Sequence, residues 1–320
     1  MNSLDWDVLV ELRQRYLSET AGQLDYWKSQ HVLEQYDQVY GRRILWKWEG
    51  ILALLAHCAW DFNKTKVIVD WGCGTGVASE AYLPRLASSE TELLLWDKSE
   101  LALEFSLAKL KSQFPSISMR KMELGETLLK GFTLLLSHVI SELSERKLNE
   151  LIRLASGAGR ILWVEPGTPK VSQKLIEVRE KFMGHLKVIA PCPHQSPCGL
   201  NGRVGKDWCH HFIQPPQEVF HSGVWTEIGR RLQIDLRSLP VSYLAMDSGK
   251  GPAQADFQIL GRPRRYKGQT KVLWCDAHHV ESREISQKKD SDLYEAVTKL
   301  DSDFAQPPFN FCSQKEEPVL

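Results

Sequence analysis

The stretch KVIVDWGCGTGV, residues 66–77, constrains the fold of this chain more than any other segment. An apolar run ends in Asp70 and is followed by Gly72, Gly74 and Gly76, after which a helix-like pattern begins. Glycine is needed where the backbone turns tightly or closely approaches a ligand. A dinucleotide-binding loop would have a glycine at position 77, where this chain has valine. We expect a strand, a ligand-binding loop and a helix in succession.

A carboxylate ends the next predicted strand. The run LLLWD brings Asp97 to a strand end 21 residues after Gly76. An acid at about this separation can accept hydrogen bonds from the hydroxyl groups of a ribose. Charge-assisted hydrogen bonds of this kind contribute roughly 1.5–3 kcal/mol. We favour ligand binding for Asp97 over the role of an ordinary solvated loop residue.

Short apolar runs alternate with amphipathic stretches through the middle of the chain. We expect strands over 66–72, 91–97, 117–122, 132–140 and 159–167, with helices over 77–88, 99–114 and 144–157. Such alternation implies a mainly parallel, doubly wound α/β sheet covered on both faces. Residues 1–60 have helical periodicity, a further helix is expected over about 168–186, and strand-like runs return at 239–248, 257–263 and 270–276.

The composition is that of an average soluble protein, with 42% apolar and 25% charged residues and a formal net charge of zero. The overall charge therefore does not indicate nucleic-acid binding, and any basic surface must be local. No apolar run approaches the roughly 20 residues of a membrane span. Early acids at Asp5, Asp7 and Glu11 argue against a secretory signal or a transit peptide. Seven scattered cysteines favour reduced thiols, and we expect a cytoplasmic monomer.

The glycine loop and the second acid resemble two motifs of the class I S-adenosylmethionine (SAM)-dependent methyltransferases, which have a Rossmann-like fold. The resemblance extends from about Lys66 to Gly167. It implies that SAM binds to Asp70, Gly72, Gly74, Gly76 and Asp97. In that family the loop cradles the methionine part of SAM, and the acid corresponding to Asp97 holds the ribose.

Catalytic candidates lie at the expected ends of the fourth and fifth strands. Enzymes of this fold that methylate base amino groups commonly carry an Asn/Asp-Pro-Pro-aromatic motif after the fourth strand, whereas this chain has LSHVISEL at 136–143. His138 could act as a general base, because its unperturbed pKa lies near neutrality, or could be a packed strand-end residue. Glu165 could bind or orient substrate, or could merely precede a turn built by Pro166 and Gly167.

The segment APCPHQSPCGLNGRVGKDWCHHF, residues 190–212, holds Cys192, Cys198 and Cys209. Their separations are wider than the usual C-x2-4-C pairs of zinc sites. Iron–sulfur clusters are larger and tolerate irregular spacing, but a cluster needs a fourth ligand, for which Cys275 at a predicted strand end is a candidate. Nearby histidines keep a mixed zinc site open, and unliganded thiols are a third alternative. These histidines are His185, His194, His210 and His211.

Segments around these cysteines resemble the methyltransferase-like assembly factors of the mitochondrial small ribosomal subunit and their bacterial relatives. They are PCPH at 191–194, PCGL at 197–200 and DWCHHF at 207–212, with further likeness in HVISEL at 138–143, VEPGTP at 164–169 and VSYL at 241–244. The resemblance spans about 40–286 and implies that Cys192, Cys198, Cys209 and Cys275 hold a [4Fe–4S] cluster, with zinc as the alternative. The chain departs from the family pattern at Thr133, at Gly199 and in the longer gap at 201–205.

A basic segment, GRPRRYKGQTK at 261–271, precedes Cys275 and contains five basic residues and no acid. Its cations can contact phosphates and Tyr266 can stack on a base, although a solvated turn could have the same composition. The family resemblance implies contact with ribosomal RNA through Arg262, Arg264, Arg265 and Lys267.

We expect five regions along the chain. These are a helical region over 1–62, a SAM-methyltransferase core over 63–186, a cysteine-rich metal-binding insertion over 187–238, C-terminal strands with the basic segment over 239–304, and a disordered tail over 305–320.

Two functions compete. One is an RNA methyltransferase acting on the small ribosomal subunit or its precursor, in the cytoplasm or the mitochondrial matrix. The other is a non-catalytic assembly factor that binds ribosomal RNA. A radical enzyme is disfavoured because the C-x3-C-x2-C triplet of that class is absent.

Overall fold

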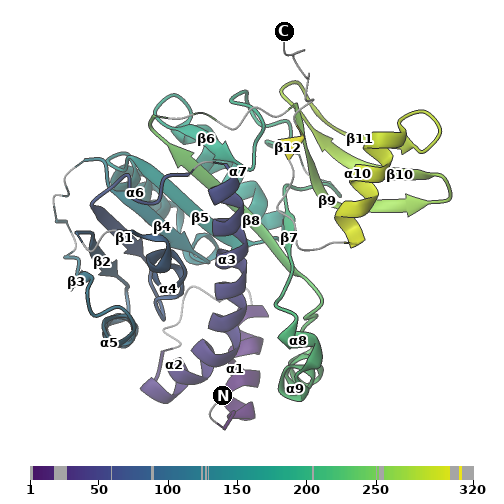
Figure 1. Ribbon diagram of the computed structural model, residues 1–320. Helices are drawn as coiled ribbons and strands as arrows, with labels where there is room; N and C mark the ends of the chain where they lie inside the picture. The colour runs from purple at the N-terminus through teal and green to yellow at the C-terminus, as the bar shows by residue number, and fades with distance from the viewer. Residues whose placement is uncertain are drawn as a thin grey trace.

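The computed structural model describes residues 3–17, 27–58, 60–87, 90–123, 125–126, 128, 130–203, 205–249, 251, 256–302 and 310–311. Its centre is an eight-stranded sheet in the order β3-β2-β1-β4-β5-β8-β6, with β7 paired to β8 (Figure 1). The strands are β1 (Val67–Trp71), β2 (Glu92–Trp96), β3 (Ser118–Lys121), β4 (Thr133–Ser137), β5 (Arg160–Pro166), β6 (Lys187–Ala190), β7 (His211–Ile213) and β8 (Leu239–Asp247).

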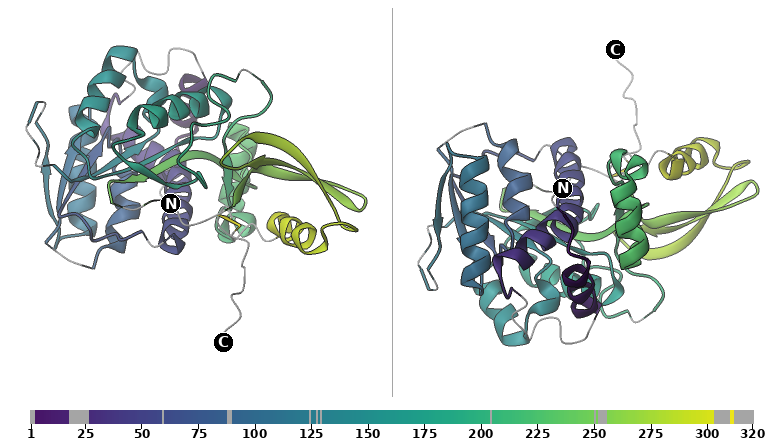
Figure 2. Two further views of the ribbon diagram at one scale, coloured as in Figure 1. Left: turned by 90° about the horizontal axis from the view of Figure 1, so that it is seen from above. Right: turned by 90° about the horizontal axis from the view of Figure 1, so that it is seen from below.

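The first five strands pair in parallel, as predicted, and β8 runs antiparallel to β5, β6 and β7. Successive residues of a strand point to opposite faces, so Leu93 and Leu95 join one hydrophobic core and Leu94 joins the other. Helices α3 (Arg42–His57), α4 (Val77–Tyr82) and α5 (Glu100–Gln113) cover one face, and α6 (Glu145–Ala155) and α7 (Pro169–Phe182) cover the other (Figure 2). The predicted doubly wound α/β fold is confirmed.

The N-terminal region is helical, as its periodicity indicated. It consists of α1 (Trp6–Leu17), α2 (Gln30–Tyr36) and the short π-helix η1 (Asp37–Gly41), which continues into α3. The hydroxyl of Tyr40 donates a hydrogen bond to the carbonyl of Leu9 at 2.7 Å, so η1 is fixed to α1. A Cβ atom on Gly41 would lie 3.0 Å from Oδ1 of Asp37 and 3.5 Å from Oγ1 of Thr75. The helical region therefore packs directly against the glycine loop.

A second, antiparallel sheet lies to the side of the first and has the order β11-β10-β9-β12 (Figure 1). Its elements are β9 (Phe257–Tyr266), β10 (Gln269–Cys275), β11 (Val280–Ser286) and β12 (Asn310–Phe311), and α10 (Ser291–Ser302) packs on it. The sequence pattern predicted β9 and β10 but no strand or helix for the charged stretch that forms β11 and α10. Residues 310–311 pair with β9, unlike the disordered tail expected for 305–320, whose other residues lie outside the described ones.

The chain between α7 and β8 contains elements that the sequence did not predict. They are β6, β7, α8 (Glu218–His221) and α9 (Gly223–Leu232). The short 3-10 helices η2 (Leu83–Arg85) and η3 (Ile140–Glu142) lie earlier in the chain. Within the described residues, no helix combines the length and apolar character needed to cross a bilayer.

Candidate functional site

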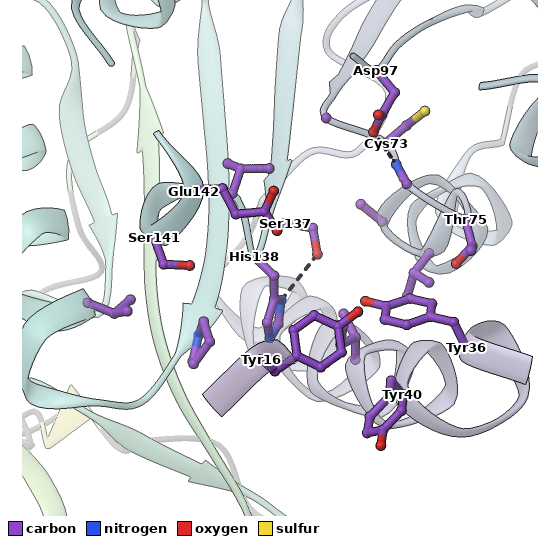
Figure 3. A pocket seen from close by; sticks show the side chains of 18 of the residues that line it. Tyr16, Tyr36, Tyr40, Cys73, Thr75, Asp97, Ser137, His138, Ser141 and Glu142 are labelled. Carbon is purple, nitrogen blue, oxygen red and sulfur yellow. Dashed lines mark hydrogen bonds between the residues drawn. The ribbon is translucent and has the colours of Figure 1, made fainter. Parts of the chain in front are cut away.

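A cavity of about 620 Å³ opens where β1, β2, β4 and β5 end. Trp71, Trp96, Ser137 and Pro166, the last residues of these strands, all line it. In open α/β sheets, ligands bind outside the carboxyl ends of the strands. Tyr16, Tyr36 and Tyr40 lie on its helical side, and Asp97 lies with the glycine loop on another side (Figure 3). The cavity is therefore in the place where this fold holds ligands.

The glycine loop has the backbone conformation that its sequence predicts. Gly72, Gly74 and Gly76 have φ angles of 73°, 52° and 77°, which other residues rarely adopt. A Cβ atom on Gly72 would lie only 2.7 Å from Cγ1 of Val139, the second residue after β4. The loop therefore approaches the end of β4 closely, and a larger residue at 72 would push the two apart.

Asp97 joins the glycine loop to the second strand. Its Oδ2 atom accepts a hydrogen bond from the amide of Gly74 at 2.8 Å, and Oδ1 accepts one from the amide of Ser99 at 2.9 Å. Burial raises the pKa of this carboxyl. The carboxyl faces the cavity and can accept further hydrogen bonds from a ligand, because each carboxylate oxygen has more than one lone pair.

Two of the predicted cofactor residues lie behind the cavity wall. Asp70 is fully buried, and its Oδ2 atom accepts a hydrogen bond from Oγ of Ser79 at 2.6 Å. Burial raises the pKa of Asp70 to about 7. Gly76 is the N-cap residue of α4 and packs against Leu110. These residues shape the loop, while Gly72, Gly74 and Asp97 line the cavity itself.

His138 directly follows the last residue of β4 and has a strained backbone conformation. Its φ angle of 57° is uncommon for a residue other than glycine, and such strain tends to occur at functional sites. Its Nδ1 atom is 3.4 Å from Oγ of Ser137, which accepts a hydrogen bond from the Trp48 indole at 2.9 Å (Figure 3). Its Nε2 atom is 3.4 Å from Nζ of Lys47. Burial, followed by the charges of Lys47 and Arg43, lowers the pKa of His138 well below its usual value, so the imidazole is neutral.

Lys47 is a cavity residue that the sequence analysis missed. It is 8% exposed, and burial followed by the charge of Arg43 lowers its pKa to about 7. The signal that could have found it is the helical spacing of Tyr36, Tyr40, Arg43 and Lys47, which places these residues along one stripe. That stripe forms the helical side of the cavity.

Glu165 is buried behind the cavity rather than facing it. Its Oε1 atom accepts hydrogen bonds from the amides of Val139 and Ile140, both at 2.9 Å, and from the Trp163 indole at 2.6 Å. Burial raises the pKa of Glu165 to about 7. Its carboxylate therefore fixes the turn that carries His138.

The four predicted metal ligands come together from separate segments. Cys192 follows β6, Cys198 and Cys209 lie in the loop before β7, and Cys275 ends β10. Burial raises the pKa of the Cys209 thiol, and the neighbouring thiols of Cys192, Cys198 and Cys275 raise it further. In the part of the chain that the structure describes, no three His, Cys, Asp or Glu side chains are grouped as the ligands of one metal ion. The thiols are thus neighbours without converging on a single point.

Two histidines lie beside these thiols. Nε2 of His194 is 3.9 Å from Sγ of Cys275, and Nε2 of His211 is 4.0 Å from Sγ of Cys209. His210 instead stacks on Trp208 with ring centroids 4.3 Å apart. His194 and His211 are therefore the histidines that border the thiol group.

The basic residues predicted to contact RNA lie on the hairpin of β9 and β10. Arg262, Arg264, Arg265 and Lys267 are all exposed. The guanidinium of Arg262 lies 4.3 Å from the ring centroid of Phe212, and a second cavity of about 270 Å³ separates this hairpin from Trp208. The hairpin thus presents cations beside aromatic rings at an exposed edge.

Several solved methyltransferase structures are similar to this chain. A provisionally assigned RNA methyltransferase from Pyrococcus horikoshii is 14% identical, with 62% of this chain and 83% of that chain covered and a TM-score of 0.40. Magnesium protoporphyrin IX methyltransferase from Synechocystis PCC 6803 is 14% identical, with 78% and 100% covered and a TM-score of 0.39. Mitomycin 7-O-methyltransferase is 15% identical, with 76% and 68% covered and a TM-score of 0.43.

No curated protein sequence matches this chain. A family model described as "Mitochondrial small ribosomal subunit Rsm22" matches residues 48–302. The matched segment includes the whole glycine loop, the end of β4 and all four clustered cysteines. The chain therefore belongs to the Rsm22 family of the mitochondrial small ribosomal subunit.

Proposed function

We propose that this protein binds SAM in the 620 Å³ cavity and transfers its methyl group to a component of the small ribosomal subunit or its precursor. The observation that carries the proposal is the hydrogen bond between Gly74 and Asp97, which lies in the same cavity as the end of β4. Oγ1 of Thr75 is a buried hydroxyl without a hydrogen-bond partner among the described residues. The cavity thus presents donors and acceptors of the kind that a nucleoside cofactor needs.

When bound, SAM supplies an electrophilic methyl group. Asp97 would hold the ribose hydroxyls, and the amides of the glycine loop would hold the methionine part. His138 would take the proton released by the acceptor, because its imidazole is neutral and lines the cavity. Glu165 would keep His138 in place through the turn after β4.

The test is transfer of labelled methyl groups from SAM to small-subunit particles lacking this protein. We expect labelling by the wild-type protein, none by Asp97→Ala and much less by His138→Asn. Asparagine suits the test because it tolerates a positive φ angle and lacks a basic nitrogen. Binding of SAM without any labelling would contradict methyl transfer.

Two observations favour the non-catalytic alternative. Both ring nitrogens of His138 already have neighbours, and the segment after β4 lacks the motif of base-amino methyltransferases. An assembly factor would need only to bind the particle. If Asp97→Ala and His138→Asn support normal assembly of small subunits in cells, this alternative is preferred.

We propose that Cys192, Cys198, Cys209 and Cys275 hold a [4Fe–4S] cluster, with zinc as the alternative. The support is the gathering of four thiols around Cys209, and a cluster accommodates ligands that are too far apart for one ion. Iron and sulfide should copurify under anaerobic conditions and be absent from Cys209→Ser. Cys58→Ser is the matched control, because Cys58 lies at the end of α3. Stoichiometric zinc without sulfide would contradict the cluster.

We propose that the protein acts in the mitochondrial matrix, with the cytoplasm as the alternative. We also propose that the β9–β10 hairpin contacts ribosomal RNA. The support is that all four cations are exposed and that Arg262 and Arg264 line a cavity together with Trp208, His210 and Phe212. Each cation that no longer meets a phosphate should reduce the slope of log affinity against log salt by about one. The variant with Arg264, Arg265 and Lys267 replaced by Gln should lower that slope by about two to three. An unchanged slope would place the RNA surface elsewhere.

A further inference from the structure

Three cationic side chains line one wall of the cavity. Arg43 and Lys47 lie one helical turn apart on α3, and Arg13 comes from α1. Their charges act on one another, because Arg13 lowers the pKa of Arg43 and Arg43 lowers that of Lys47, in both cases after burial. We name these three residues the cationic wall.

Among the described residues, the carboxylates of Asp235 and Glu165 act on the cationic wall, but neither forms an ion pair with it. None of the three residues forms an ion pair within the described part of the chain, and the Nε atoms of Arg13 and Arg43 are buried without a hydrogen-bond partner. Asp235 acts on Arg43, but its carboxylate is engaged by the guanidinium of Arg237 at 2.8 and 3.0 Å. The cations therefore face the cavity and one another.

Glu165 acts on Lys47 from behind the cavity but forms no ion pair with it. The Nζ atom of Lys47 is 3.4 Å from Nε2 of the neutral His138, and Oε1 of Glu165 accepts hydrogen bonds from two amides and an indole. Buried like charges are costly unless an opposite charge joins them. A cavity that keeps such a wall is suited to a ligand that brings the missing negative charge.

We propose that Arg13, Arg43 and Lys47 form a binding site for an oxyanion of the ligand. Tyr40 lines the same cavity, and the charges of both arginines act on its hydroxyl. Guanidinium groups suit carboxylate and phosphate because their fork of donors matches two oxygen atoms. The site borders His138, so it adjoins the place proposed for methyl transfer.

Two oxyanions fit the proposed reaction, namely the carboxylate of the cofactor's methionine part and a phosphate group of an RNA acceptor. The choice between these two oxyanions rests on the proposed function. The existence of an oxyanion site does not rest on it, and binding of inorganic phosphate can test the site independently.

The experiment uses the full chain and the variants Arg43→Met and Lys47→Met, with Arg42→Met as the matched control. Arg42 is the exposed neighbour of Arg43 and does not line the cavity. Calorimetry would measure binding of S-adenosylhomocysteine, of 5′-methylthioadenosine, which lacks the carboxylate, and of inorganic phosphate with and without saturating S-adenosylhomocysteine. Thermal melting would confirm that each variant is folded.

If the carboxylate occupies the site, both variants weaken S-adenosylhomocysteine binding by about tenfold or more and leave 5′-methylthioadenosine unchanged. If the acceptor phosphate occupies it, S-adenosylhomocysteine binding is unchanged, and the variants lose phosphate binding to the saturated protein. Unchanged binding of every probe, or an equal loss in Arg42→Met, would overturn the oxyanion site. Failure of the wild type to bind 5′-methylthioadenosine would instead count against the proposed cofactor, while loss of phosphate binding in the variants would still support the site.

Discussion

The Nζ atom of Lys47 lies 3.4 Å from Nε2 of His138, although 91 residues separate the two in the sequence. The contact joins α3 to the end of β4 inside the cavity. Burial is the largest cause of the lowered pKa of both groups. At neutral pH the imidazole of His138 is therefore neutral and the amine of Lys47 is partly neutral. The fold gains little stability from either group.

Replacing Lys47 by methionine should stabilise the protein. Methionine fills a similar volume and removes a buried charge that forms no ion pair, so we expect the free energy of unfolding to rise by about 1–4 kcal/mol. Urea denaturation at pH 7 would measure the change. Lys66→Met, at an exposed lysine, is the control and should change stability little. A loss of stability in Lys47→Met would show that the charge is compensated in the folded state.

The stability gained by replacing Lys47 with methionine should depend on pH. The pKa of Lys47 is about 7 in the folded protein, against an ordinary value of 10.5, so between these values the unfolded state binds more protons. The contribution of Lys47 to the free energy of unfolding of the wild type therefore rises with pH between about 7 and 10.5. The advantage of Lys47→Met over the wild type should be largest at or below pH 7 and should shrink between pH 7 and 9.5. Parallel stability curves for the two proteins would contradict the lowered pKa.

Asp97→Ala should weaken binding of S-adenosylhomocysteine by about 10- to 100-fold. The substitution removes an acceptor for the ribose hydroxyls and the partner of the Gly74 amide, and charge-assisted bonds contribute roughly 1.5–3 kcal/mol. Calorimetric titration would measure the affinity. Glu104→Ala, on the exposed face of α5, is the control and should bind as the wild type does. Equal affinities of Asp97→Ala and the wild type would remove the ribose role from this residue.

Glu165→Ala should be much less stable to heat than Glu165→Gln. Alanine leaves the amides of Val139 and Ile140 and the Trp163 indole without an acceptor, at a cost of roughly 1–3 kcal/mol for each buried donor. Glutamine keeps an acceptor oxygen in place and should be tolerated far better. Thermal unfolding followed by circular dichroism separates the two. Similar melting temperatures for the two variants would mean that the carboxylate does not hold this turn.

The fold was predictable because its signals are local. The strands β1–β5 follow from apolar runs at regular intervals, and the φ angles of Gly72, Gly74 and Gly76 follow from glycines that only a tight loop requires. The strands β6 and β7 have only four and three residues, and the turn-rich cysteine segment between them hid both from the sequence pattern.

The cavity was predictable only in part. Gly72, Gly74 and Asp97 were expected to share one site and do so, whereas their role in binding SAM stays a prediction. The helical spacing that includes Lys47 was a usable signal, but its contact with His138 depends on the approach of α3 to β4, a tertiary contact without a sequence motif. The position of Glu165 behind the wall likewise depends on which donors the fold brings to it.

The family segment begins at residue 48, one residue after Lys47. A fragment trimmed to residues 48–302 would keep the glycine loop and all four clustered cysteines and would lose Arg13, Arg43 and Lys47 together. Such a fragment would still be recognised as a family member while its cavity lacked one side. Membership of the family therefore carries no information on the charge that this side of the cavity presents to a ligand.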